Sequence, residues 1–137
     1  MAAVTELIRK ETDGTLSFGD YTLDGKKKLE DFPADGDLYK VKTYHEITKL
    51  ERNGLFVYES VPGTAVTHFA ETDEEMHFTV SGTEDAQITV EMSEEEEYEV
   101  KIDGTSIGTM KTNLGGKLSF NVELEAEKEV LVEVIHK

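Results

Sequence analysis

Apolar and polar residues alternate through most of the stretch from residue 87 to residue 137. Successive runs place an apolar residue at every second position: Ile88, Val90 and Met92; Tyr98, Val100 and Ile102; Leu118, Phe120, Val122 and Leu124; Val130, Val132 and Val134. Side chains of an extended strand point alternately to opposite faces, so this period of two is typical of strands with one buried face and one wet face. A helix would need a period of about 3.6 residues, and no stretch of ten or more residues supports one. The sequence therefore predicts an all-β fold.

Short glycine-containing pairs separate many of the runs and predict tight turns. Asn53-Gly54 lies between strand-like runs at 47–52 and 55–60. A two-residue type I′ turn needs positive φ at both central positions, which asparagine and glycine tolerate, so this pair predicts a β-hairpin. Three more predictions concern connections: hairpin turns at Asp103-Gly104 and Gly115-Gly116, closure of the last strand pair by residues 125–128, and one long charged loop at residues 24–37.

The remaining strand-like runs cover residues 5–10, 16–18, 38–44, 64–71 and 76–81. Short strands separated by frequent turn signals predict an antiparallel β-sandwich of the immunoglobulin-like or jelly-roll type, with about 10–12 short strands. The 137 residues are predicted to form one domain, and the alternative is an N-terminal subdomain, 1–75, packed on a sandwich-like part, 76–137.

The last strand differs from the others because apolar residues occupy both of its faces. Leu131 and Ile135 lie opposite Val130, Val132 and Val134. A strand that is apolar on both faces is usually central in a sheet or covered on both sides. We therefore expect a strand that is either central or covered on both sides, with the N-terminal half as the candidate cover for its second face.

Charge is unevenly distributed along this acidic chain, whose formal net charge is −16. Residues 1–70 hold 9 Lys+Arg against 12 Asp+Glu, whereas residues 71–137 hold 5 against 18. A strongly negative surface repels phosphate backbones and anionic lipids, so the charge argues against nucleic acid and membrane surfaces as partners. It also favours solubility.

The chain contains no cysteine, which excludes disulfide bonds and thiolate metal sites. Glu6, Arg9 and Lys10 interrupt the N-terminal segment, which lacks the apolar core of a secretory signal, and no apolar run reaches the ~18 residues of a membrane span. These features predict a cytoplasmic protein, with export by a non-classical route as the alternative.

Candidate metal ligands are the histidines and a group of aspartates. His68 and His77 lie in runs predicted to be neighbours, so they could approach each other as a metal pair. The carboxylates around Gly36 loosely resemble a calcium loop but lack the EF-hand order of ligands. The candidates are His45, His68, His77 and His136, with Asp31, Asp35 and Asp37, and the acidic run Glu94, Glu95, Glu96 and Glu97. No spacing matches a known ligand signature, so no metal site is predicted.

Catalytic and cofactor signatures are also missing from the sequence. No serine stands in a Gly-x-Ser-x-Gly turn, and no cysteine is available as a nucleophile. The glycine-rich segments 104–108 and 113–116 join predicted strands, so they cannot hold phosphate at a helix N-terminus. Lys26, Lys27 and Lys28 either bind an anion or form a solvated face. The prediction is a protein with no catalytic residues and no cofactor.

Four segments, which together run nearly end to end, carry a family resemblance: 16–21 (LSFGDY), 37–43 (DLYKVKT), 56–64 (FVYESVPGT) and 111–118 (KTNLGGKL). With these segments the chain resembles a family of short bacterial proteins that often carry the name "endosialidase". Residues 98–135 are also similar to the last hairpins of immunoglobulin-like accessory modules in bacterial polysaccharide-active enzymes.

The family name implies a glycosidase, so the residues of this chain can be compared with those that sialidases use. Sialidases resemble one another in a clamp of three arginines on the sugar carboxylate, whereas this chain has two, Arg9 and Arg52, and it has no tryptophan. Lysine does not replace the bidentate guanidinium well. We therefore predict that the protein is not an enzyme and does not hydrolyse polysialic acid.

Two function classes remain from the sequence. The first is a non-enzymatic structural or interaction protein that self-assembles, or docks on a protein partner, through an exposed edge or apolar face. The second is a carbohydrate-binding module that would stack a glycan on aromatic side chains. Its candidate residues are Tyr39, Tyr44, Phe56 and Tyr58.

Overall fold

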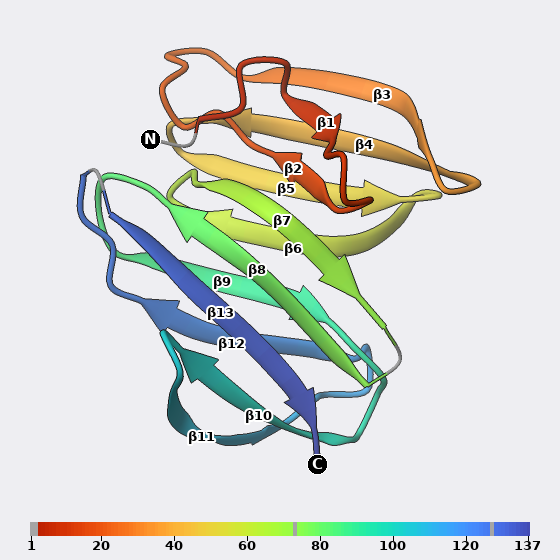
Figure 1. Ribbon diagram of the computed structural model, residues 1–137, viewed down its shortest axis with the longest axis vertical. Helices are drawn as coiled ribbons and strands as arrows, with labels where there is room; N and C mark the ends of the chain where they lie inside the picture. The colour runs from red at the N-terminus through yellow and green to blue at the C-terminus, as the bar shows by residue number, and fades with distance from the viewer. Residues whose placement is uncertain (1–2, 73, 127) are drawn as a thin grey trace.

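The computed structural model describes residues 3–72, 74–126 and 128–137, and it is all-β within those ranges (Figure 1). The strands are β1 (Ile8–Lys10), β2 (Leu16–Phe18), β3 (Lys27–Ala34), β4 (Asp37–Tyr44), β5 (Ile47–Arg52), β6 (Leu55–Val61), β7 (Ala65–Glu71), β8 (Glu75–Ser81), β9 (Ala86–Glu91), β10 (Glu97–Ile102), β11 (Thr105–Lys111), β12 (Lys117–Val122) and β13 (Glu129–His136). They form two antiparallel sheets, which confirms the predicted β-sandwich. No helix in these ranges is long and apolar enough to cross a membrane.

Sheet A has seven strands in the order β1-β2-β7-β8-β13-β10-β11, and sheet B has six in the order β12-β9-β6-β5-β4-β3. Strands from both halves of the chain occur in each sheet, and their buried apolar side chains form one cluster between the sheets. Aromatic rings occupy its centre. Phe18 meets Tyr58 edge-on with ring centroids 5.3 Å apart, and Tyr58 meets Phe78 at 5.5 Å. Burying each such side chain stabilises the fold by about 2–3 kcal/mol.

The hairpin predicted at Asn53-Gly54 is confirmed. Arg52 of β5 pairs with Leu55 of β6, which leaves a two-residue turn. Asn53 has φ 53° and Gly54 has φ 80°, as a type I′ turn requires. The Asp103-Gly104 hairpin is confirmed in the same way, because Ile102 pairs with Thr105 across it.

The predicted loop at residues 24–37 is wrong, because most of it is strand β3, which pairs with β4. Its turn is Asp35-Gly36, and both residues have positive φ. The register of β3 shifts between Leu29 and Phe32, where the chain bulges. The bulge puts two partly buried apolar residues three positions apart, so the alternation that would have revealed a strand is interrupted.

Two predicted hairpins join strands that lie in different sheets. β11 belongs to sheet A and β12 to sheet B, so Gly115-Gly116 is part of a crossing between sheets. β12 pairs with β9, and β13 lies between β8 and β10, so residues 125–128 do not close a hairpin either; Glu127 lies outside the described residues. A turn signal shows where the chain reverses, but it does not say which strand the chain pairs with afterwards.

β13 is central in sheet A, which is one of the two predicted alternatives, but the proposed cover of its second face is wrong. Leu131 is 40% exposed on that face, and Ile135 is half-buried. Polar residues pair beside them, since Thr79 lies opposite Leu131 and Glu75 opposite Ile135. The N-terminal half therefore does not cover this face. The first strand is also shorter than predicted, because residues 5–7 form a turn before Ile8.

Candidate functional site

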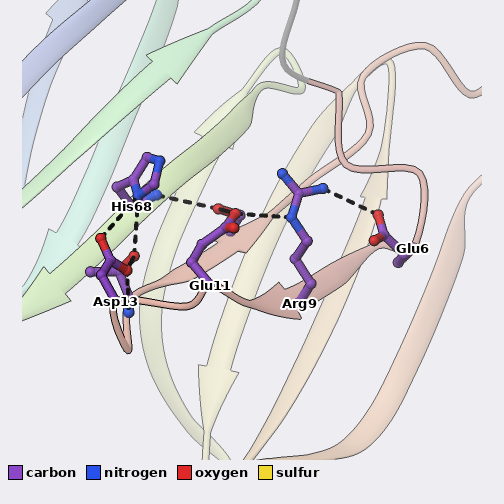
Figure 2. A network of polar contacts seen from close by, with 7 residues as sticks. Glu6, Arg9, Glu11, Asp13 and His68 are labelled. Atoms are coloured by element: carbon purple, nitrogen blue, oxygen red, sulfur yellow. Dashed lines mark hydrogen bonds and ion pairs between the residues drawn. The ribbon is translucent and has the colours of Figure 1, made fainter.

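A polar cluster joins the first two strands to β7, and Figure 2 shows its members. Arg9 of β1 contacts Glu6 through Nη1 at 3.2 Å and Glu11 through Nε at 2.9 Å. His68 lies in the bulge of β7 with φ 55°. Its Nδ1 is 3.4 Å from Asp13 Oδ2. The same nitrogen is 3.3 Å from the Thr15 hydroxyl. Both contacts of the imidazole therefore use one nitrogen, whereas a base in a nucleophile–histidine–acid relay uses both.

The carboxylates of this cluster act as hydrogen-bond acceptors. The fully buried Ser17 hydroxyl donates to Glu11, and this hydrogen bond lowers the pKa of Glu11 below its ordinary value. The hydroxyl and backbone N–H of Thr15 lower the pKa of Asp13 in the same way. A general acid at neutral pH needs a raised carboxyl pKa instead. This geometry fits a structural clasp that fixes the β1–β2 turn on β7.

The remaining candidate ligands are dispersed. His77 pairs with Ala70 across β7 and β8, which are neighbours as expected. Asp35 pairs with Lys10 at 2.8 Å, and Asp37 accepts a hydrogen bond from Asn53 Nδ2 at 2.9 Å. His45 Nδ1 is 3.2 Å from the backbone oxygen of residue 23. Within the described ranges, no group of three or more histidines and carboxylates could hold a metal ion.

Both arginines are engaged by carboxylates. Arg52 Nη1 is 3.1 Å from Glu71 Oε1, which connects β5 of sheet B to β7 of sheet A. Arg52 and Glu71 both line a cleft of about 240 Å³. Arg9 has the two carboxylate partners described above. Each guanidinium is therefore already paired with a carboxylate of this chain.

The aromatic residues proposed as a glycan platform do not share one exposed surface. Tyr39 and Tyr58 are buried in the core. Tyr44 and Phe56 are partly buried. Lys117 Nζ lies 4.7 Å from the Phe56 ring centroid and covers part of that ring. Sugar stacking would need wider exposed ring faces than these positions give.

Three lysines lie side by side on the outer face of sheet B, and we call them the lysine surface: Lys28 of β3, Lys42 of β4 and Lys49 of β5. Lys28 pairs directly with Lys42, and Lys42 pairs with Lys49. Neighbouring strands are about 5 Å apart, so the three backbone positions span about 10 Å. Like charges directly opposite each other destabilise a sheet.

Carboxylates flank one end of the lysine surface. Lys49 lies 3.6 Å from Glu51 and pairs across the sheet with Glu59 of β6. Among the described residues, Lys28 and Lys42 have no ion pair. Residues 26–52, which contain β3 to β5, hold seven Lys+Arg against six Asp+Glu. Residues 53–137 hold five against nineteen. The lysine surface is therefore a basic area on a protein of net charge −16.

Four exposed glutamates, Glu94, Glu95, Glu96 and Glu97, lie in and after the β9–β10 connection, and we call them the acidic end. Figure 1 shows β3, β4 and β5 at one end of the long axis and this connection toward the other. The fold thus separates opposite charges along its length. Sequence reasoning identified the acidic run and Lys28. It missed Lys42 and Lys49, because only the strand register brings them beside Lys28.

His136 fixes the C-terminus of β13 at the acidic end. Its Nε2 is 2.8 Å from Glu96 Oε1, and its Nδ1 is 3.3 Å from Glu74 Oε2. The hydrogen bond that the His136 imidazole donates to Glu96 raises the pKa of His136 above the ordinary 6.5, and the charge of Glu74 adds to the effect. The imidazolium thus bridges the β7–β8 turn and the β9–β10 connection.

The raised pKa of His136 predicts a specific pH dependence of stability. The imidazolium binds its proton more tightly in the folded state, so its contribution is complete below the unfolded value of 6.5 and is lost as pH rises through the folded pKa. We expect His136→Gln to lower the melting temperature relative to the wild type below pH 6.5, with the difference shrinking above it. His77→Gln, which removes an imidazole without an ion pair in the described residues, is the control. A difference that is constant with pH would contradict the bridge.

No family model, curated protein or solved structure matches this chain. The resemblance of its four segments to the endosialidase-named family stays a prediction.

Proposed function

We propose that the protein is a non-enzymatic interaction protein that assembles with copies of itself, the lysine surface of one copy resting on the acidic end of the next. The observation that carries this proposal is the row Lys28, Lys42 and Lys49, which the register aligns on strands far along the molecule from the β9–β10 connection (Figure 1). Each surface concentrates like charge that an opposite surface would neutralise.

Electrostatic repulsion within each surface supports a partner of opposite charge. Lysines directly opposite each other repel, as do consecutive glutamates. Contact between a lysine surface and an acidic end relieves both repulsions, whereas contact between two identical surfaces increases them. The two surfaces are different, so the contact is heterologous, and two joined copies still have one free lysine surface and one free acidic end. The expected product is a chain of copies.

The outer face of β13 is a weaker candidate for the contact between copies than the charged surfaces are. Leu131 and Ile135 are the apolar residues there, and their register partners on β8 and β10 include Thr79, Glu75 and Glu99. Two separated apolar side chains bury far less area than a stable interface needs. The charged contact is therefore the stronger candidate.

Salt should weaken this assembly. The screening length falls from about 10 Å at about 0.1 M salt to about 3 Å at 1 M, so attraction between exposed charges is largely lost. In sedimentation velocity, we expect the weight-average sedimentation coefficient to fall toward that of a monomer as sodium chloride rises. An apolar interface in so acidic a protein would show the opposite trend.

A matched pair of variants separates the lysine surface from net charge. Replacing Lys28, Lys42 and Lys49 by glutamine removes three surface pairs of about 0.2–1 kcal/mol each, so association should weaken about tenfold. Replacing Lys101, Lys111 and Lys128 by glutamine changes net charge equally but removes positive charge outside the lysine surface, and should not weaken association. Equal weakening would contradict the proposed contact. A monomer at every salt and protein concentration would overturn it.

A further inference from the structure

The two sheets do not match at one side of the sandwich, because sheet A has one strand more than sheet B. β1 of sheet A lies against β3 of sheet B, so the unmatched side is where β11 and β12 are the edges (Figure 1). β11 extends past β12 with no strand of sheet B facing it. Thr105 to Thr109 of β11 are accordingly exposed on both faces. Sheet B therefore lacks a strand opposite β11.

A groove of about 410 Å³ opens at this place, between β11 and the end of β12. Val122 and Val130, which are buried, and the partly exposed Ile102 and Ile107 supply its apolar lining. Ile107 is the extra residue of a bulge, since Val100 pairs with Gly108 and Lys101 with Ser106. Bulges re-aim side chains, and here the bulged residue lines the groove while remaining 45% exposed.

Three of the four sheet edges carry features that discourage strand addition. β3 has Lys27, Lys28, Pro33 and a bulge. β1 has three residues, and β11 has a bulge with Gly108 at φ 124°. β12 pairs with β9 over six consecutive residues without a register shift, and Lys117 at its start is its one charged residue. Among the described strands, β12 is thus the edge best suited to accept another strand.

We infer that the free edge of β12 accepts an extended, basic segment of a partner protein, which adds to sheet B as a seventh strand and covers β11. Main-chain hydrogen bonds to β12 would hold the segment, and every second side chain would enter the groove, as in other cases of strand addition. β-branched side chains suit those positions.

The charge around the groove indicates a basic occupant. Asp103 and Glu123 lie in its lining with Lys128 as the one cation, and residues 71–137 hold 5 Lys+Arg against 18 Asp+Glu. A second copy pairing through its own β12 would bring the same carboxylates against each other. Lysine or arginine at the ends of the added strand would neutralise them. This inference uses a different surface from the proposed self-assembly and does not depend on it.

Fluorescence anisotropy with labelled seven-residue peptides tests the inference. The probe is Lys-Val-Thr-Val-Thr-Val-Lys. One control has proline at the central valine, which removes a donor and prevents strand pairing, and another has glutamate at both ends. We expect the probe to bind at least about tenfold more tightly than either control. In a ¹⁵N–¹H spectrum, the probe should shift the amide signals of residues 117–122.

Two variants locate the binding. Ile107→Lys puts a positive charge in the groove at an exposed position and should weaken probe binding about tenfold or more. Leu114→Lys, which makes the same change at an exposed position outside the groove lining, should not. The inference is overturned if the proline peptide binds equally well, if the shifts centre on Glu94–Glu97, or if no peptide binds. Shifts of residues 117–122 with protein concentration alone would assign the edge to a second copy and also overturn it.

Discussion

Replacing Gly19 with alanine is expected to destabilise the protein by about 3 kcal/mol or more. Gly19 follows β2 with φ 98°, which L-residues with a Cβ rarely adopt. A Cβ at this position would lie 2.4 Å from the backbone oxygen of Thr64 and 3.1 Å from Thr48 Cγ2. That oxygen also accepts a hydrogen bond from the Thr48 hydroxyl at 2.8 Å. The methyl group would therefore force Gly19, which follows β2, away from Thr64, which precedes the neighbouring strand β7.

Gly14→Ala is the matched control for this change. Gly14 has φ 89°, but a Cβ there meets no atom within 4 Å. Its substitution should therefore cost only the backbone strain, about 1 kcal/mol. Urea unfolding of both variants measures the difference. If both variants lost the same free energy of unfolding, the close approach at Gly19 would add nothing to the backbone strain.

Replacing Thr64 with valine should destabilise the protein by about 2 kcal/mol, although the two side chains have nearly the same shape. The Thr64 hydroxyl is fully buried and lies 2.8 Å from both the Tyr58 and the Ser60 hydroxyls. Tyr58 is itself buried, and burial raises the pKa of its phenol, which keeps the hydroxyl neutral. Valine would leave these hydroxyls with fewer partners and no access to water.

Thr89→Val provides the comparison on the outer face of sheet B. The Thr89 hydroxyl is 2.7 Å from Ser119 at an exposed position, so water can replace the lost partner. We expect the free energy of unfolding, measured with urea, to change by less than about 0.5 kcal/mol. If Thr64→Val and Thr89→Val had the same effect, the buried hydroxyl network would not contribute to stability in the way the fold suggests.

Strand identity was predictable wherever alternation was regular. The runs containing Val90, Val100 and Val132 are strands with those residues buried, and the Asn53-Gly54 turn follows from local backbone preferences alone. β3 was not predictable, because a bulge interrupts its alternation. The pairing of β12 with β9 was not predictable either. Consecutive strands often pair, but here the core is closed by crossings between sheets, which no local signal specifies.

The candidate surfaces depend even more on tertiary structure. Lys28, Lys42 and Lys49 are separated by gaps of fourteen and seven positions in the sequence, and only their register on three strands aligns them. The groove beside β12 exists because one sheet has an extra strand, which also cannot be read from residue order. By contrast, Glu94 to Glu97 are consecutive, so the sequence alone revealed the acidic end.

Mixing two charge-reversed variants tests the head-to-tail contact most directly. The first carries Lys28→Glu, Lys42→Glu and Lys49→Glu, and the second carries Glu94→Lys, Glu95→Lys and Glu97→Lys, leaving Glu96 to pair with His136. Each variant alone has two surfaces of the same sign, so each should sediment as a monomer at low salt. In an equimolar mixture, every contact joins opposite charges, so assembly should return. Assembly of either variant alone, or a mixture that stays monomeric, would contradict the account.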